Sequence, residues 1–415
     1  TCYNVESHIN NGCLSLHQKP VDLQALREDF LPQIGQGIRG FLFWQYRPEV
    51  LGREAPAWGL VGLDGSDRPV TGAARSFWHT LERCAGELMN CPAPNAAVGV
   101  WKSRRNEIAH FCTDHRLDPL AEAVEGYLKT LYWHNLPYRI VSETMLENGD
   151  LDGIRLLILP SPYFLTEAET RSLDRWVRAG GVLLTDAHLA AYDLTTGRHS
   201  RVLPGAGLAD AWGIRERLTT SSYHLELEDG GGPFEGETTE DVRKALETFG
   251  TSGGLFFPIR LPDGTLAWGA NRYARLEASG APVEATFDGT TPCMVSKSIG
   301  DGAVFYAGTL LGRGAANGTR GLVKILEKVC RRAHIAPSLE AAPETAGAVH
   351  LDEIRDAEGG LRFLVAVNRT DRPQRVTVNL TGSWKGLFSG QTWDGDSRSV
   401  VVPPGADLLV PDIDT

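Results

Sequence analysis

The sequence predicts an α/β protein that ends in a small all-β domain, and three patterns support this prediction. Residues 1–92 alternate short apolar runs with stretches whose apolar residues recur every three or four positions, and residues 93–337 do the same. Alternating strands and helices indicate parallel βαβ units. Residues 338–415 instead alternate polar and apolar residues between turn-forming residues, which indicates antiparallel strands. We therefore predict three domains with these boundaries.

The first domain is predicted to run strand, helix, strand, helix. The strands are Thr1–Val5 and Ile38–Tyr46, and the helices are Val21–Ile34 and Ser76–Leu88. We interpret this domain as the C-terminal end of a (β/α)8 barrel, a fold that carries its active site at the carboxyl ends of the strands. Two βα units cannot close a barrel or bury their own sheet. We therefore expect a missing N-terminal barrel segment or a partner chain to complete them.

The start of the chain agrees with that interpretation. The sequence lacks a starting Met and begins at a predicted strand, which we interpret as truncation or processing. No basic region followed by an apolar one is visible at the N-terminus, so no signal peptide is predicted.

The second domain follows a linker at Cys91–Asn95 and has the pattern of a flavodoxin-like, doubly wound sheet. Asp118-Pro119 predicts a helix start with an acidic cap, and Thr166–Glu169 has the pattern of a capping box. Residues 195–300 are rich in Gly, Thr and acids and are hard to assign. The predicted strands are Ala97–Trp101, Tyr138–Ser142, Arg155–Pro160, Val182–Thr185 and Ala303–Ala307, and the closing helix is Gly321–His334.

The third domain is predicted to be a small antiparallel β-sandwich. Turn residues such as Asp394–Asp396 and Pro403–Gly405 separate its strands. The predicted strands are Leu361–Asn368, Arg375–Leu380, Trp384–Leu387 and Ser399–Val402.

Composition limits the classes of partner. With 41 basic and 52 acidic residues the formal charge is −11, which argues against nucleic acid or an anionic membrane as the main partner. No apolar run approaches the roughly 20 residues of a membrane span. The seven cysteines are scattered and are expected to be reduced, which favours a cytoplasmic location. Zinc binding by Cys84 and Cys91 is disfavoured because no further ligand stands at metal spacing, so no metal or cofactor is predicted.

The candidate site lies at the ends of the first two strands. Glu6 follows the first strand, Trp44 and Arg47 end the second, and Glu54 precedes Trp58 in the next loop. Retaining glycosidases need an ionised carboxylate beneath the anomeric carbon and a second carboxyl as acid/base. Aromatic rings bind the apolar faces of sugars, and carboxylates and guanidinium groups bind their hydroxyls. These residue types at strand ends therefore indicate a sugar site.

Each of these residues also has a structural interpretation. Glu6 and Glu54 are the kind of residue that is often merely solvated, and Trp44 is as consistent with a core position. Arg47 is as consistent with an ion pair to Glu49 or Glu28. The interpretation as a site depends on the group rather than on any one residue.

The spacing of these residues resembles the seventh and eighth strands of glycoside hydrolase family 42 β-galactosidases. The motif is Glu6, then Trp44 to Arg47, then Glu54 before Trp58-Gly59-Leu60. The resemblance continues through NAAVGVWKS and LDGIRLLILPSPYFLTEAETRSLDRWVRAGGVLLTD, which look like that family's trimer-building middle domain. It thus covers nearly the whole chain, as the C-terminal portion of a family member.

The resemblance implies a function and roles for the site residues. The chain would be part of a retaining β-galactosidase that acts on terminal β-D-galactosyl residues of galactosides or oligosaccharides. Glu6 would be the nucleophile, and Trp44, Arg47, Glu54 and Trp58 would bind substrate. The acid/base Glu of the family lies on an earlier barrel strand and is missing from this chain, so the chain alone is expected to be inactive. A homotrimer is expected.

Two departures from the family pattern affect the expected substrate. The family usually has a His three residues after the second sugar-binding Glu, where this chain has Ala57, and the loop after Glu6 has Leu14 and Ser15 in place of a Trp. Galactosides remain the expected substrates, with α-L-arabinopyranosides as an alternative.

A second hypothesis is a non-catalytic fragment that binds galactosides or mediates oligomerisation. The middle domain resembles the glutamine-amidotransferase fold, but Leu184–His188 contains no Cys to serve as its nucleophile. Amidotransferase chemistry is therefore disfavoured.

Overall fold

The chain divides into two compact units, which are described separately. In this computed structural model the described residues are 2–9, 21–52, 54–94, 96–114, 117–193, 196–221, 256–337, 347–378, 380–394 and 399–412. Unit 1 joins the two ends of the chain, and unit 2 holds most of its middle. Unit 1 comprises Thr1–Pro94, Trp133–Pro137 and Pro337–Thr415, and unit 2 comprises Asn95–Tyr132 and Tyr138–Ala336.

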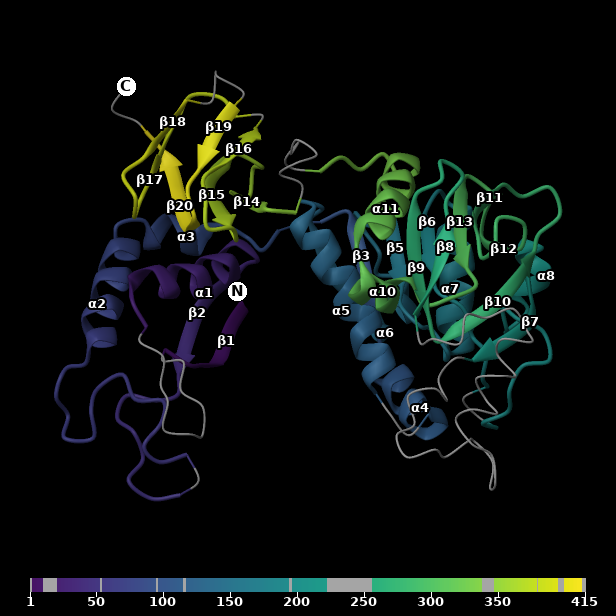
Figure 1. The fold of residues 1–415 in the computed structure, drawn as a ribbon, viewed down its shortest axis with the longest axis horizontal. Helices are drawn as coiled ribbons and strands as arrows, with labels where there is room; N and C mark the ends of the chain where they lie inside the picture. The colour runs from purple at the N-terminus through teal and green to yellow at the C-terminus, as the bar shows by residue number, and fades with distance from the viewer. Residues whose placement is uncertain are drawn as a thin grey trace. The chain divides into compact units, whose positions relative to one another are not determined.

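Unit 1 begins with two parallel strands and three helices (Figure 1). Asp22 caps the first helix, because its Oδ1 accepts a hydrogen bond from the backbone N–H of Ala25 at 2.9 Å. The second helix begins seven residues before the predicted start, where the backbone N–H of Arg68 donates to Thr71 Oγ1 at 2.9 Å. The elements are β1 (Cys2–Ser7), α1 (Leu23–Gly35), β2 (Ile38–Phe43), α2 (Pro69–Glu82) and α3 (Ala85–Asn90).

The rest of unit 1 is antiparallel. A five-stranded sheet of order β14-β15-β20-β17-β18 and a two-stranded sheet of β16 and β19 share one apolar core, which includes Trp384, Trp393 and Val400. The strands are β14 (Val349–Arg355), β15 (Leu361–Asn368), β16 (Gln374–Thr377), β17 (Ser383–Gly386), β18 (Thr392–Asp394), β19 (Ser399–Val402) and β20 (Gly405–Pro411). The sequence pattern missed β14, β18 and β20.

Helix α1 lies against both the parallel and the antiparallel part of unit 1 (Figure 1). Phe30 and Leu26 of α1 share a core with Phe363 of β15 and Leu408 of β20. Arg27 Nε donates to the carbonyl oxygen of Ala406 at 2.5 Å. The segments predicted as first and third domains therefore pack on one another within this unit.

Unit 2 is built on a nine-stranded mixed sheet of order β4-β3-β5-β6-β13-β12-β11-β8-β9. Its parallel strands are β3 (Val98–Lys102), β4 (Tyr138–Ser142), β5 (Leu156–Leu159), β6 (Val182–Thr185) and β13 (Gly302–Ala307). The antiparallel strands are β8 (Phe256–Arg260), β9 (Leu266–Ala270), β11 (Val283–Thr286) and β12 (Pro292–Ile299), and β7 (Arg215–Ser221) pairs with β10 (Arg272–Glu277). The helices are α4 (Arg104–Asp114), α5 (Asp118–Trp133), α6 (Glu143–Asn148), α7 (Glu167–Arg178), α8 (Leu208–Trp212), α10 (Leu311–Gly314), the 3₁₀ helix η3 (Ala315–Asn317) and α11 (Arg320–Arg332).

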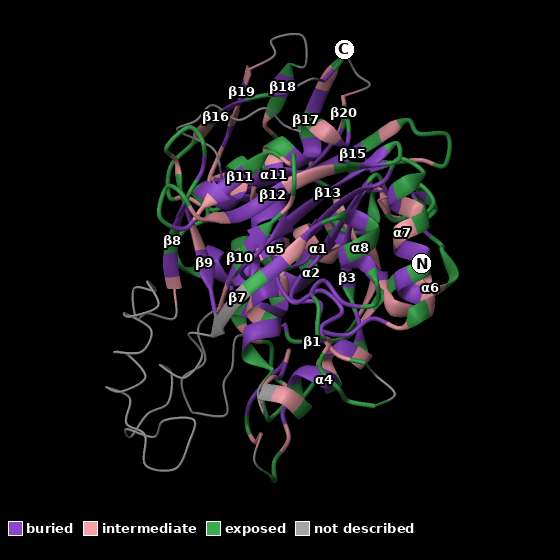
Figure 2. Ribbon diagram, turned by 90° about the vertical axis from the view of Figure 1, so that its right-hand side faces the viewer, coloured by how far each residue is buried: buried purple, intermediate pink, exposed green. Residues whose placement is uncertain are grey.

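The five parallel strands of unit 2 follow the strand order of flavodoxin-like sheets. The central strand β13 is buried along its whole length, and β12 is buried at Cys293–Val295 (Figure 2). The capping box predicted at the start of α7 is present: Glu169 N donates to Thr166 Oγ1 at 3.1 Å, and Thr166 N donates to Glu169 Oε2 at 2.7 Å. The antiparallel strands β8, β9, β11 and β12 extend the sheet with part of residues 195–300, which the sequence pattern left unassigned.

Asp186, just after β6, connects four segments of unit 2. It is fully buried and accepts hydrogen bonds from Tyr127 Oη at 2.7 Å and from the backbone N–H groups of Ser161 and Leu311, each at 3.1 Å. Burial raises the pKa of its carboxyl to about 7, although these hydrogen bonds act to lower it.

Two further features of the described residues are the length of their helices and the state of their cysteines. None of the helices in the described part is both long and apolar enough to cross a membrane. Within that part, the six cysteines Cys2, Cys84, Cys91, Cys112, Cys293 and Cys330 form no disulfide, and Cys13 lies outside it.

The raised pKa of Asp186 predicts a specific pH dependence. Because the folded state binds this proton more tightly than the unfolded chain, Asp186 loses stabilising effect as pH rises from 4 to 7, by at most about 1.4 kcal/mol per pH unit. Asp186→Asn removes the titrating group and costs about 1–3 kcal/mol in hydrogen bonds. We expect the stability gap between wild type and Asp186→Asn to narrow from pH 4 to pH 7 in urea unfolding. The exposed Asp210→Asn is the control, and a gap independent of pH would contradict the prediction.

Candidate functional site

The carboxyl ends of β1 and β2 form one edge of unit 1. The strands are parallel, with Ser7 opposite Phe43, and the backbone N–H of Trp44 donates to the carbonyl oxygen of Ser7 at 2.9 Å. Glu6 lies within β1 rather than after it, with 74% of its side chain exposed. The pairing of the strands therefore brings residues 6–8 beside residue 44, although they lie far apart in the sequence.

Trp44 and Glu54 are in direct contact. Trp44 Nε1 donates a hydrogen bond to Glu54 Oε2 at 3.1 Å. Trp44 is 43% exposed, so it is not a core residue. This bond fixes an aromatic ring and a carboxylate side by side, with part of the ring open to solvent.

Trp58 joins the same edge through the backbone. Its carbonyl oxygen accepts from the N–H of Gln45 at 3.1 Å, and the N–H of Leu60 donates to the carbonyl oxygen of Gln45 at 3.0 Å. The ring of His8 stacks on the ring of Trp58, with centroids 4.1 Å apart and an interplanar angle of 26°. His8 Nε2 also lies 3.9 Å from Glu6 Oε1.

The Arg47 side chain lies beside a turn rather than beside the other candidate residues. It is exposed, and its guanidinium group lies beside Gly65, where an added Cβ would come within 2.6 Å of Nη2. Hydrogen bonds from Ser66 are the main reason that the pKa of Asp64 is lowered, and Arg47 adds a small effect in the same direction. Among the described residues Arg47 forms no ion pair with Glu49 or Glu28, and no contact with Glu6 or Glu54 is present there.

Sequence reasoning missed three polar groups at this edge. Besides His8, these are Ser7 Oγ and Gln45 Nε2, which are buried and have no hydrogen-bond partner among the described residues. The sequence signal that could have found Ser7 and His8 is that they directly follow Glu6. Gln45 could have been found in the same way, because it directly follows Trp44. Among the described residues, no group of three or more His, Cys, Asp or Glu side chains is placed to hold a metal ion.

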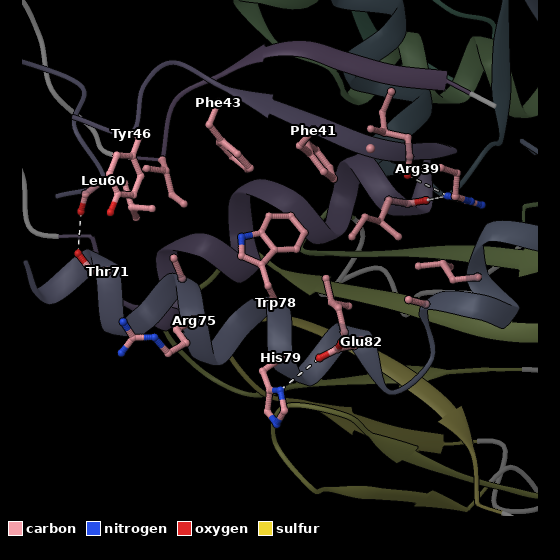
Figure 3. Close-up of a pocket in the computed structure, with 18 of the residues that line it drawn as sticks. Arg39, Phe41, Phe43, Tyr46, Leu60, Thr71, Arg75, Trp78, His79 and Glu82 are labelled. Atoms are coloured by element: carbon pink, nitrogen blue, oxygen red, sulfur yellow. Dashed lines mark hydrogen bonds and ion pairs between the residues drawn. The ribbon is translucent and has the colours of Figure 1, made fainter. Parts of the chain in front are cut away.

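A large apolar cavity lies between β2 and helices α2 and α3. Its volume is about 980 Å³. Figure 3 shows Phe41 and Phe43 of β2 pointing toward Trp78 of α2, and both ring-to-ring distances are 5.7 Å. Gln45 and Tyr46 line the end nearest the candidate site.

Arg39 places a cation in this cavity. Its Nη1 donates to the carbonyl oxygens of Ile34 at 2.6 Å and Ile38 at 3.1 Å, whereas Nε and Nη2 are buried without a hydrogen-bond partner in the described part of the chain. Burial lowers the pKa of this guanidinium. Leaving such atoms without a hydrogen bond is energetically costly.

The edge as a whole can bind a polyol and present a carboxylate to it. One exposed aromatic ring, Trp44, offers an apolar face, and Glu54 offers acceptors for hydroxyl groups. Glu6 offers a solvent-accessible carboxylate on the neighbouring strand.

Comparisons with known proteins show what the whole chain is similar to. No family model matches the chain. The chain is 22% identical over 413 residues to the β-galactosidase BbgII of Bifidobacterium bifidum, a match that covers 95% of this chain and 53% of the relative.

The solved structures point the same way. A β-galactosidase from Bacillus circulans sp. alkalophilus matches with a TM-score of 0.75 at 15% identity, covering 97% of this chain and 54% of that chain. Gan42B, a GH42 β-galactosidase from G. stearothermophilus, matches with a TM-score of 0.72 at 16% identity, covering 97% and 53%. The chain spans about half the length of these proteins. The chain is thus similar in sequence to a β-galactosidase and in fold to solved β-galactosidases that include a GH42 enzyme, and its match to about half of their length is consistent with a C-terminal portion.

Proposed function

We propose that this chain is the C-terminal portion of a retaining β-galactosidase that hydrolyses terminal, non-reducing β-D-galactosyl residues. The observation that supports the proposal best is the shared edge of β1 and β2, where the hydrogen-bonded pair Trp44 and Glu54 follows β2 and Glu6 lies near the end of the adjacent strand β1. The relatives named above are β-galactosidases, which supports this substrate class.

Glu6 acts as the nucleophile in the proposed mechanism. One of its carboxylate oxygens forms a bond to the anomeric carbon while the bond from that carbon to the leaving-group oxygen breaks. The leaving oxygen takes a proton from an acid/base carboxyl on a part of the protein outside these 415 residues. In the second step that carboxylate removes a proton from water, and the water oxygen displaces Glu6 from the anomeric carbon.

The other candidate residues bind the sugar. The Trp44 ring packs against the apolar face of galactose, and Glu54, held in place by the Trp44 Nε1–H, accepts hydrogen bonds from hydroxyl groups. Trp58 contributes through the stacked pair with His8. Arg47 acts in substrate binding only if its guanidinium turns away from the turn at Gly65.

The apolar cavity beside β2 supports a larger barrel. We propose that β1, β2, α1 and α2 are the end of a (β/α)8 barrel and that an upstream segment or a partner chain packs into this cavity. The rings of Phe41, Phe43 and Trp78 would pack against apolar side chains of that segment. Arg39 Nε and Nη2, which have no hydrogen-bond partner among the described residues, would donate to acceptors on it. Such a segment would also bring the acid/base carboxyl to the site. As in the sequence analysis, the barrel end, the middle domain and the β-sandwich are proposed as separate domains.

A non-catalytic fragment is the second candidate. The exposure of Glu6 favours it for the isolated chain, since solvent is not excluded from this carboxylate. Galactoside binding without turnover is what this alternative predicts.

Removal of the Glu6 carboxylate tests the mechanism. In the longest natural polypeptide that contains this chain, Glu6→Gln should lower kcat for a nitrophenyl galactoside at least about a thousandfold, equivalent to about 4 kcal/mol in the barrier. The 415-residue chain alone should show negligible hydrolysis. Glu82→Gln on α2 is the matched control. Hydrolysis by the isolated chain that Glu6→Gln abolishes would overturn the proposal that a second segment is needed.

Removal of the Trp44 ring tests sugar binding. Trp44→Ala should raise KM for the galactoside about five- to tenfold, because roughly 1 kcal/mol of ring packing is lost. Trp44→Phe keeps a ring and should have less effect, although it removes the hydrogen bond to Glu54. Trp268→Ala in unit 2 is the control. An unchanged KM in Trp44→Ala would exclude this ring from the sugar site.

Self-association tests the proposed homotrimer. Unit 2 exposes Ile108 at 58% and Phe111 at 55% on helix α4, an apolar surface suited to a second copy of the chain. Light scattering should approach three times the 45.2 kDa chain mass as concentration rises. Phe111→Glu should shift the population toward monomer, and Val283→Glu on β11 should not. A monomer at every concentration would rule the trimer out for this chain.

A further inference from the structure

His8 lies at the candidate site, and the proposed mechanism uses only its stacking contact with Trp58. Its ring nitrogen Nε2 is 3.9 Å from Glu6 Oε1, and its side chain is half as exposed as that of Glu6, at 37% against 74%. Both residues belong to the end of the first strand, where Glu6 points into solvent. Among the described residues, the side chain of His8 therefore lies against the proposed nucleophile.

The position of the His8 ring is set by a different segment. It stacks on Trp58 at 4.1 Å, and the backbone of Trp58 is bonded to Gln45 at 3.1 Å. Trp58 has a φ of 65°, a conformation uncommon for residues other than Gly, and its loop is tied to the end of β2 by the bond from Leu60 to Gln45. The imidazole ring is thus held by Trp58, in the loop after β2, while its Nε2 lies near Glu6 of β1.

We propose that His8 is a positioning residue that holds the Glu6 carboxylate for attack on the anomeric carbon. This inference rests on the proposed function. In the imidazolium form, or in the tautomer with a proton on Nε2, the imidazole attracts the carboxylate and limits its rotation. A carboxylate misplaced by about 1 Å loses rate by roughly a hundredfold, so a group that restrains it acts mainly on kcat.

The role proposed for His8 is different from that of an ion pair that only stabilises the fold. Exposed ion pairs contribute only about 0–1 kcal/mol to folding, so the Glu6–His8 contact by itself adds little stability. Its geometry nevertheless joins the nucleophile on β1 to the loop of Trp58 after β2. That connection restrains the two strand ends relative to each other at the point where the sugar is expected.

Two substitutions separate polar positioning from ring stacking. His8→Phe keeps a ring to stack on Trp58 but has no N–H for Glu6, whereas His8→Gln keeps an N–H donor but no ring. In the longest natural polypeptide containing this chain, we expect His8→Phe to lower kcat for a nitrophenyl galactoside about tenfold, with KM changed less than about twofold. We expect His8→Gln to stay within about threefold of wild type.

Galactose binding gives a second readout that needs no turnover. In a Glu6→Gln background no carboxylate remains to be positioned, so adding His8→Phe should leave galactose affinity, measured by calorimetry, within about twofold. The control is His199→Phe in unit 2, an exposed histidine whose ring lies 4.8 Å from that of Tyr192. Circular dichroism checks that each variant folds, and His8→Leu replaces His8→Phe if the latter does not.

The outcomes separate this proposal from the proposed function. A wild-type protein without galactoside hydrolysis would overturn both. An active wild type with kcat unchanged in His8→Phe would overturn only the role of His8. The positioning role of His8 would also be overturned if His8→Gln lost activity while His8→Phe kept it, because only the stacking of the ring on Trp58 would then be needed. A tenfold loss in His8→Phe with rescue by His8→Gln supports positioning.

Discussion

The packing of Phe30 holds the candidate site in place. This α1 side chain contacts the rings of Phe41 and Phe43 on β2 at 5.1 and 5.5 Å, and those of Phe77 and Trp78 on α2 at 5.9 and 5.8 Å. A two-stranded parallel sheet has too little apolar surface to be stable alone. The aromatic cluster supplies that surface, and the β-sandwich covers α1 from its other side through Phe363 and Leu408. The orientation of the strand ends, and with it the site, depends on this core.

The two units use their polar side chains in different ways. In unit 2, His188 Nδ1 lies 3.1 Å from Glu216 Oε2, and Tyr306 Oη donates to Glu216 Oε1 at 2.6 Å. Burial lowers the pKa of His188. Burial also acts to raise the pKa of Glu216, but His188 and the hydrogen bonds lower it overall. These groups sit at the carboxyl edge of a doubly wound sheet, where such folds bind ligands, yet they are buried and engaged with one another. In unit 1, Glu6, Trp44 and His8 are partly or largely exposed, which suits them to meet a substrate.

Under the proposed function, a further part of the protein would account for both the exposure of the site and the open cavity. A sugar-hydrolysing site excludes water and places two carboxyl groups about 5–5.5 Å apart in a retaining enzyme. One strand edge cannot do either, and the wall formed by Arg39, Phe41 and Trp78 offers a place for the structure that would. The match to about half the length of related β-galactosidases agrees with that explanation.

Residue type and pattern were enough to predict part of the local structure and to name candidate site residues. The amphipathic pattern gave α1 to within two residues, and β4, β6, β15 and β19 have the predicted bounds. The capping box at Thr166 formed as predicted because its hydrogen bonds involve residues only three apart. Glu6, Trp44 and Glu54 were identified because residue type and position at strand ends are visible in a sequence.

Tertiary structure decided which of these residues meet. The stacking of His8 on Trp58 joins segments 50 residues apart, and no local pattern encodes such a contact. Arg47 was placed beside Gly65 by the fold of a turn, away from the other candidates. The antiparallel strands β8, β9, β11 and β12 escaped prediction because short strands take their pairing from neighbours in the sheet rather than from their own periodicity. The union of the two chain ends in unit 1 likewise depends on an apolar core formed between α1, β15 and β20, which only the folded chain brings together.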